Sequence, residues 1–434
     1  MVLANANLST FPNTVRPSLS YRFDGTTGDL SLTPSDPDFF QNPYPTYAEL
    51  HAQSGEAGPI VHWDAYGHWV FGGSNTVNAL FRDRRLGRQI THLVDRDTLG
   101  WPRMPDHLSD FYALEATSLL ELEPPSHTRL RGLINRAFIS RNIASLRSSI
   151  AATANALLDD LQSGEPVDLI AQFCEPLAVT TIAAMLGIGE EEGPRLLNWS
   201  HAMVRMYQAE RTYQDEVLAN TAAQEFAQWV EELVLARREA PGDDLLSQLV
   251  EARDSGDRLS NEEIVSTTIL LLNAGHEATV HALGHALHQL LIAPSDTTKA
   301  WLQDPAPFVE EVLRYRPPLH MFTRYVLEDC ELFGRPFKQG DVVGLHIGMA
   351  NHDPIVMPNP QLFDPSRKPI RNVAFGAGIH FCIGHTLARL EMETVLPMVM
   401  ERWPQIKLAE QPCIKDAYHF HGLERLIVNL EVGQ

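Results

Sequence analysis

One segment, residues 257–294, constrains the fold of this 434-residue chain more than any other. It reads DRLSNEEIVSTTILLLNAGHEATVHALGHALHQLLIAP, and its middle is apolar nearly all round a helical projection. Ser260 followed by Glu263 is the capping-box pattern that begins a helix, and Pro294 ends it. A helix that is apolar on all sides must be enclosed by other elements. The sequence therefore predicts a long helix running through the core of one domain.

The rest of the chain is predicted to be mainly helical with small β-sheets. Helical patterns dominate from residue 44 onward, and short strand-like segments occur at GPIVHW, HWVFGG, HMFTRYVLED and VVGLHIGMA. Residues 84–120 are irregular, and a loop of that length is usually functional. Residues 1–30 are polar and lack periodicity, so we expect a loosely ordered tail, followed by a single domain over residues 31–434.

The charge of the chain limits its partners. A net charge of -21 repels nucleic acid and anionic membranes. No apolar run approaches the roughly 18 residues that span a bilayer, and the first residues lack a signal-peptide pattern. We therefore expect a cytoplasmic protein with no membrane or nucleic-acid partner. Residues 126–147 are the exception, since they carry five arginines and no acid. They form either a solvated basic helix face or a docking surface for an acidic partner.

The four cysteines include one in an unusual setting. None belongs to a C-x-x-C pair, so zinc-ribbon and iron–sulfur frameworks are unsupported. Cys382 lies in AFGAGIHFCIGHTLARLE, residues 374–391, among glycines and directly before a helical pattern. A lone thiolate near a helix N-terminus suits an axial haem ligand. The alternative is a small buried apolar side chain.

The pattern around this cysteine resembles the haem-binding loop of the cytochrome P450 family. It reads F-G-x-G-x-H-x-C-x-G, with the fixed positions at Phe375, Gly376, Gly378, His380, Cys382 and Gly384. The resemblance covers about residues 35–430 and fits the bacterial, ferredoxin-dependent type. It implies haem b (iron protoporphyrin IX) with Cys382 as the axial thiolate and metal ligand, and Phe375 shielding the sulfur. It also implies the P450 fold, a single triangular haem-enclosing domain.

Two further groups of residues resemble elements of the family. Glu311 and Arg314 share a helix face, and with Arg367 they resemble the E-x-x-R helix and the meander arginine, a structural triad rather than a catalytic one. His127 and Arg131 resemble the H-x-x-x-R pair that binds the haem propionates. The resemblance adds Arg324 and His380 to that propionate set. Alone, each of these basic residues would be read as a solvated side chain.

The motif AGHEAT, residues 274–279, resembles the A-G-x-[D/E]-T-T element above the haem. The resemblance implies that Ala274 leaves room for dioxygen and that Glu277 delivers protons. The alcohol that normally follows the acid is replaced here by Ala278, and Thr279 is a weaker catalytic candidate that faces elsewhere. A substrate hydroxyl, ordered water held by Glu277, or poor oxygen activation could each follow from this change.

The predicted substrate pocket draws on the long helix and on a strand. Asn273 stands where the family generally has an aliphatic residue, so Asn273 or His320 is expected to hydrogen-bond a polar group on an otherwise apolar substrate, or else to bind water or a backbone carbonyl. The candidate pocket residues are Leu270, Asn273, Ala274, Leu319, His320 and Phe322.

The reaction implied is monooxygenation. One oxygen atom from O2 would enter a small or medium-sized, mostly apolar molecule, with electrons from NAD(P)H passing through a ferredoxin reductase and a ferredoxin. Arg129, Arg136 and Arg141 are the candidate docking face for that acidic ferredoxin, and a monomer is expected. The alternative is a haem-thiolate protein that uses peroxide or binds a ligand without monooxygenation.

Overall fold

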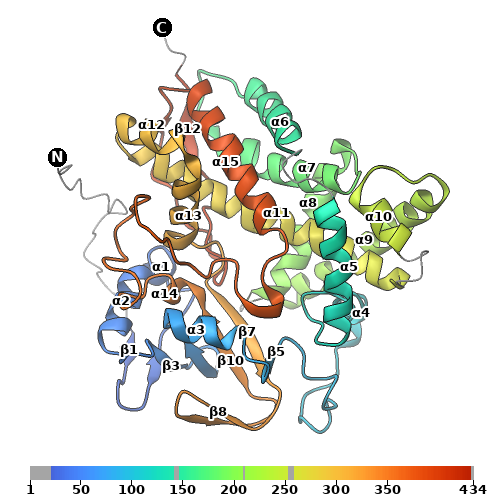
Figure 1. Cartoon of the computed structure of the whole chain (residues 1–434), viewed down its shortest axis with the longest axis vertical. Helices are drawn as coiled ribbons and strands as arrows, with labels where there is room; N and C mark the ends of the chain where they lie inside the picture. Colours follow the sequence, from blue (N-terminus) through green and yellow to red (C-terminus); the bar gives the residue numbers. More distant parts are fainter. Residues whose placement is uncertain (1–20, 141–145, 209–210, 253–258, 432–434) are drawn as a thin grey trace.

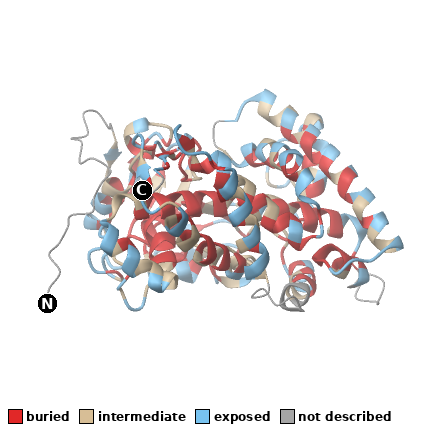
Figure 2. Cartoon of the chain, turned by 90° about the horizontal axis from the view of Figure 1, so that it is seen from above, coloured by how far each residue is buried: buried red, intermediate tan, exposed pale blue. Residues whose placement is uncertain are grey.

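The long helix forms the centre of the molecule. The computed structural model describes residues 21–140, 146–208, 211–252 and 259–431. Helix α11, Asn261–Ile292, passes through the middle of the molecule and is buried along most of its length (Figures 1 and 2). Its capping box is formed: the Glu263 N–H donates to the Ser260 hydroxyl, and the Ser260 N–H donates to the Glu263 carboxylate. The prediction of a buried central helix is thus confirmed.

Helices surround α11 on several sides. It packs against α7 (Glu175–Met185), α9 (Tyr213–Glu239), α13 (Pro305–Tyr315) and α15 (His385–Arg402). The remaining helices are α1 Pro37–Phe40, α2 Tyr44–Ala52, α3 Ser74–Leu80, α4 Ser109–Glu115, α5 Ser126–Ser140, α6 Leu146–Asp160, α8 Gly193–Val204, α10 Leu245–Ala252, α12 Ser295–Gln303 and α14 Ile347–Ala350.

A seven-stranded sheet lies beside the helices, at the lower left of Figure 1. Its order is β1-β2-β3-β4-β10-β7-β5, and β10 pairs in parallel with β4 and antiparallel with β7. The four expected strand segments are confirmed as β3, β4, β7 and β10. The strands of this sheet are β1 Arg22–Phe23, β2 Asp29–Ser31, β3 Ile60–Trp63, β4 His68–Phe71, β5 Leu86–Gly87, β7 Met321–Val326 and β10 Val342–His346.

Several short elements were not anticipated from the sequence. Strands β1 and β2 pair with each other inside the segment expected to be a tail. The expected long loop over residues 84–120 contains β5 and α4. A three-stranded sheet joins β11 (Lys407–Leu408), β12 (Ile427–Asn429) and β6 (Val167–Asp168), and β8 (Cys330–Leu332) forms a hairpin with β9 (Arg335–Phe337).

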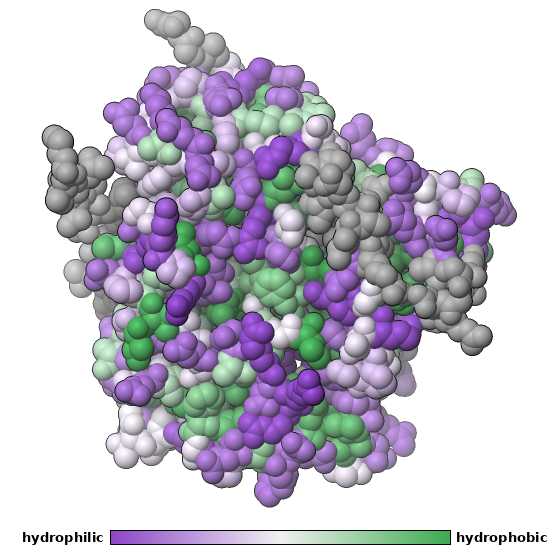
Figure 3. Space-filling model, in the orientation of Figure 1, coloured by the Kyte–Doolittle hydropathy of each residue, from purple (hydrophilic) through white to green (hydrophobic). Residues whose placement is uncertain are grey.

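Apolar side chains form a large cluster around α11 and smaller clusters on the two faces of the sheet. The face shown in Figure 3 is mostly hydrophilic, with apolar patches scattered between polar side chains. Within the described residues, no helix combines the length and the apolar character that a membrane crossing requires.

Candidate functional site

The Cys382 loop is held in a fixed turn by its backbone. Gly376 and Gly378 have φ angles of 67° and 73°, in the left-handed region that favours glycine. A Cβ on Gly378 would also lie 2.1 Å from the Phe81 carbonyl oxygen. The Cys382 N–H donates to the Phe375 carbonyl at 3.0 Å, which closes the loop. The cysteine is therefore presented two residues before Gly384, the N-cap of α15.

The surroundings of Cys382 act on the pKa of its thiol in two opposite directions. Burial raises the pKa of the Cys382 thiol, but the N–H groups of Gly384 and His385 and the Arg131 guanidinium act in the opposite direction. Such donors stabilise a thiolate once a metal ion takes the place of the proton. The loop can thus supply one soft, anionic ligand.

Basic side chains from three elements gather beside this loop. Arg131, on α5, donates from Nη2 to the Phe381 carbonyl at 2.6 Å. His127, also on α5, is 2% exposed, and its ring centroid lies 4.5 Å from that of His380. Neither nitrogen of His127 has a hydrogen-bond partner, and burial lowers its pKa to about 4. A buried imidazole with two unpaired nitrogens indicates a place for a polar ligand.

Arg324 adds a buried cation from strand β7. It is 5% exposed and donates to the carbonyl of its neighbour Thr323, and burial lowers its pKa to about 9. Among the described residues, no carboxylate lies within ion-pair distance of Arg131 or Arg324. A buried and a half-buried guanidinium group without an acidic partner are costly unless an anion joins them. These residues and Cys382 therefore fit a group that carries both a metal and carboxylates, such as haem.

Two residues of this region were missed in the sequence. Glu123 accepts a hydrogen bond from the Arg88 N–H at 2.5 Å, and its Oε1 lies 3.2 Å from Nε2 of His380. The Arg88 side chain donates to the Thr323 carbonyl at 3.2 Å, and its Nε has no partner. The only signal for Glu123 was its position four residues before His127. Arg88 gave none, because its proximity to β7 depends on the tertiary fold.

One face of α11 is open although the helix is otherwise buried. Ala274 is exposed, and Leu270, Asn273 and Ala278 are half-buried, in the middle of a run of buried residues. The Asn273 Nδ2 lies 3.6 Å from the sulfur of Met203, and its Oδ1 is buried without a partner. The accessible part of α11 thus consists of small and apolar side chains next to an amide oxygen that is buried without a partner.

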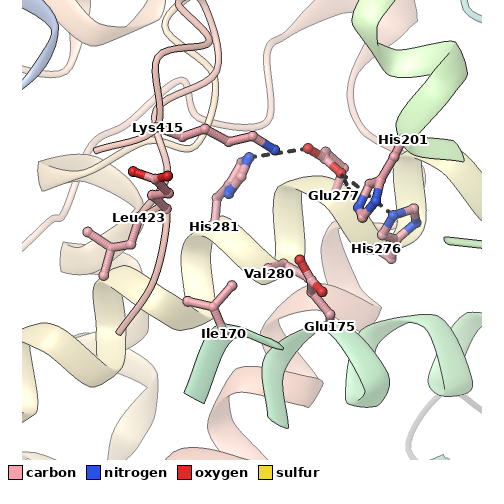
Figure 4. A pocket seen from close by; sticks show the side chains of 10 residues that line it. Ile170, Glu175, His201, His276, Glu277, Val280, His281, Lys415 and Leu423 are labelled. Atoms are coloured by element: carbon pink, nitrogen blue, oxygen red, sulfur yellow. Dashed lines mark ion pairs between the residues drawn. The ribbon is translucent and has the colours of Figure 1, made fainter. Parts of the chain in front are cut away.

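Glu277 points to a different group of side chains. Its carboxylate oxygens lie 3.5 Å from Nε2 of His281, 3.6 Å from Nε2 of His276 and 3.8 Å from Nε2 of His201 on α8 (Figure 4). Burial alone would raise its pKa, but His281, His276 and Lys415 together outweigh burial and lower the pKa to about 2. Glu277 is therefore ionised. The three histidines were missed as site residues, although their spacing in AGHEATVHALGH offered a signal for two of them.

Thr279 has its hydroxyl occupied. The Oγ1 donates to the Gly275 carbonyl one turn earlier, at 3.0 Å. Since Ala278 has no hydroxyl, neither residue after Glu277 offers a free alcohol.

The predicted pocket residues on the strand side are divided. Leu319 and Phe322 are half-buried, and Leu319 bridges to Phe420. His320 is fully buried, with its Nδ1 at 2.9 Å from the Tyr47 hydroxyl and its ring stacked on His421. The structure therefore brings Asn273, and not His320, to the open face of α11.

The predicted triad side chains meet in the core. Arg314 donates from Nε and Nη2 to the two oxygens of Glu311, each at 2.7 Å, and both side chains are fully buried. Arg367 reaches the same carboxylate at 3.3 Å. The cluster ties α13 to the segment that leads to the Cys382 loop.

The predicted docking arginines are only partly described. The Arg129 side chain is 44% exposed and pairs with Glu263 of α11. The side chain of Arg136 and the whole of Arg141 lie outside the described residues.

Comparison with known proteins places this geometry in a family. The family model described as Cytochrome P450 matches residues 102–300 and 307–430. The polyketide biosynthesis cytochrome P450 PksS of Bacillus subtilis (strain 168) is 33% identical over 414 residues, which cover 92% of this chain and 99% of that protein. The 6-deoxyerythronolide B hydroxylase of Saccharopolyspora erythraea is 33% identical over 397 residues, covering 89% of this chain and 96% of that protein.

A solved structure supports the same assignment. P450BioI, in complex with an acyl carrier protein ligated to hexadec-9Z-enoic acid, superimposes with a TM-score of 0.82 at 30% identity. The superposition covers 91% of this chain and 100% of that one.

Proposed function

The chain belongs to the cytochrome P450 family and is a monooxygenase of it, and on this premise we propose that its substrate is a mostly apolar molecule bearing a hydroxyl group near the oxidised carbon. The observation that carries this proposal is the open face of α11. There the buried, unpaired Oδ1 of Asn273 lies one residue from the exposed Ala274.

Haem would be held by the residues described above. Cys382 would bind the iron, and Arg131, Arg324 and His127 would donate to the propionates, with Arg88 as a further donor. His380, oriented by Glu123, would complete the set. Bound haem supplies the activation of O2, which no side chain of the protein can perform. The backbone N–H groups and the Arg131 guanidinium near Cys382, which oppose the effect of burial on the pKa of its thiol, support this role.

Asn273 gives the pocket its polar selectivity. A buried acceptor without a donor costs about 1–3 kcal/mol. A substrate hydroxyl that donates to Oδ1 recovers this cost, whereas a purely apolar analogue leaves it in place. We expect the amide to orient the substrate while Leu270, Ala274 and Phe322 contact its apolar part.

The same hydroxyl would serve in proton transfer. Ala278 cannot position water, and the Thr279 hydroxyl is bonded within the helix. A substrate hydroxyl beside Ala278 could take over the positioning of water, while Glu277 exchanges protons with the histidines around it. The structure thus favours substrate-assisted proton delivery over delivery by Thr279.

Electrons would reach the site from a ferredoxin and its NAD(P)H-dependent reductase. The basic character of residues 126–147 supports docking of an acidic partner on α5, which also carries His127 and Arg131. One relative was solved with its fatty acid on an acyl carrier protein, so a carrier-bound substrate is the variant to test alongside free molecules.

The test is a titration of the ferric protein with pairs of compounds that differ only by one hydroxyl, followed through the haem absorption spectrum. We expect the hydroxylated member of a matching pair to bind at least fivefold more tightly, and Asn273→Val to abolish the difference. Thr268→Val is the control, because that hydroxyl bonds within its own helix to Ile264 and its loss should leave the difference unchanged. If wild type and Asn273→Val prefer the hydroxylated compound over its analogue to the same extent, the role of Asn273 is refuted.

A turnover assay with a compound that binds in this titration distinguishes the second candidate function. The lack of a free alcohol beside Glu277 would also suit a protein driven by peroxide or one that binds ligands only. Product formation with peroxide, and none with ferredoxin, reductase and O2, would favour that alternative over monooxygenation.

A further inference from the structure

The histidines around Glu277 form a group that neither haem binding nor substrate binding uses. They line a cavity of about 60 Å³ between α7, α8, α11 and the chain near Lys415 (Figure 4). His201, His276 and Glu277 each point one ligand atom into it, and these three atoms lie within 4.8 Å of one another.

His276 is prepared to bind a cation rather than to donate a proton. Its Nδ1 lies 2.9 Å from the Leu272 carbonyl, which can only accept, so Nδ1 carries the hydrogen. In the neutral ring this leaves the lone pair on Nε2, which is buried and has no hydrogen-bond partner. That lone pair faces the Glu277 carboxylate at 3.6 Å. Two acceptors that face each other across this distance repel unless a cation lies between them.

The hydrogen bond from His276 Nδ1 to a backbone carbonyl is also the arrangement that metal-binding histidines usually show. It fixes the tautomer and the ring orientation, and it makes the other nitrogen a better ligand. The side chain of His276 is 2% exposed, so its orientation is set by packing.

Two of the three distances between the ligand atoms are close to those of a tetrahedral zinc site, and the third is no longer than 4.8 Å. Bonds of about 2.0–2.1 Å place the ligand atoms of such a site about 3.4 Å apart. The carboxylate oxygen of Glu277 lies 3.6 Å from His276 Nε2 and 3.8 Å from His201 Nε2. The His201 side chain is 43% exposed, so it can adjust and gives an ion access from solvent.

The charge and space around the group also suit a cation. Glu175 and Glu424 line the cavity with Glu277, so three carboxylates face one ammonium group, that of Lys415. The other Glu277 oxygen faces His281 at 3.5 Å and would keep that partner. The cavity leaves room for a water molecule as fourth ligand.

We propose that His201, His276 and Glu277 bind a divalent transition-metal ion of the zinc type. The ion would join α8 to α11 and occupy the carboxylate that we assign to proton delivery. Binding itself does not depend on that assignment, but the resulting inhibition of oxygen use rests on the proposed function.

The direct test measures zinc binding by the chelator-treated holoprotein. We expect calorimetry to show one site for Zn²⁺ and zinc-edge X-ray absorption to show two imidazole nitrogens and a carboxylate oxygen, separately from the haem iron. His201→Ala and His276→Asn should each weaken binding at least tenfold. His107→Ala is the matched control, because His107 also pairs with a carboxylate, Glu216, at 2.8 Å, and its loss should leave the affinity unchanged.

Two results would overturn the proposal. One is an equal zinc affinity of wild type and His201→Ala. This comparison is decisive even if replacing the buried His276 unfolds the protein. The other is a zinc-edge X-ray absorption spectrum that shows fewer than two imidazole nitrogens bound to the ion. Oxygen consumption with ferredoxin and reductase provides the separate test of inhibition. If zinc binds as expected and consumption is unaffected, the site stands and the proton-delivery role of Glu277 is refuted.

Discussion

Replacing Glu311 by glutamine should destabilise the protein far more than any exposed charge change. The Glu311 carboxylate accepts four hydrogen bonds: two from Arg314 at 2.7 Å, one from Arg367 at 3.3 Å and one from the Asp364 N–H at 2.8 Å. Glutamine has nearly the same shape, but it removes the negative charge and turns one acceptor into a donor that faces other donors. Arg314, which is fully buried, would then lack its counter-charge.

The expected cost follows from that burial. Removing one partner of a buried ion pair typically costs about 3–5 kcal/mol, and the whole stability of a domain is about 5–15 kcal/mol. The effect should therefore take a large share of the free energy of unfolding. Since the triad anchors the segment before the Cys382 loop, haem should also be lost at lower urea concentration.

Urea unfolding of the holoprotein, followed by circular dichroism and by haem absorption, measures both effects. Glu310→Gln is the matched control one residue away. Glu310 pairs with Arg389, and both side chains are about a quarter exposed, so the change should cost at most about 1 kcal/mol. If Glu311→Gln costs no more than Glu310→Gln, the buried charges of the triad do not stabilise the fold.

Three further changes have effects that follow from single contacts. Burial raises the pKa of Glu391 to about 8, so the folded state holds a proton that the unfolded state releases near pH 4.5. The stability of the fold should therefore decrease as the pH rises from about 4.5 to 8. Glu391→Gln should remove this pH-dependent loss in the free energy of unfolding, which is on the order of a few kcal/mol. If the urea midpoints of wild type and variant change with pH in the same way over this range, the expectation is contradicted. Gly378→Ala should lower the stability clearly more than Gly376→Ala. Both variants lose a glycine in the left-handed region, at about 1–2 kcal/mol, but only a Cβ at position 378 also meets the Phe81 carbonyl oxygen. Equal melting temperatures of the two variants would refute this. Glu277→Gln should lower the rates of oxygen consumption and product formation by about 10²–10⁴-fold, with a much smaller loss in Thr279→Val. The reverse order would assign proton delivery to Thr279.

The elements that could be predicted from sequence share a local signal. The capping box of α11 is written in residues three apart, and the strands β3, β4, β7 and β10 are long enough for an alternating pattern. Strands such as β5, β6 and β11 have two residues each, which is too short for any periodicity to show. What defines these strands is their pairing with segments that are distant in the sequence.

The sequence by itself determined the long buried helix, the glycine-rich cysteine loop and the Glu311–Arg314 pair of the triad, because each depends on neighbours within a few positions. Only the tertiary structure decided where the side chains point. It turned His320 into the cluster around Tyr47, left Asn273 at the open face of α11, and brought His201 of α8 to Glu277, 76 positions later in the chain. Helix periodicity gives the face on which a residue lies, but the neighbour that meets this face is fixed only when distant elements pack together.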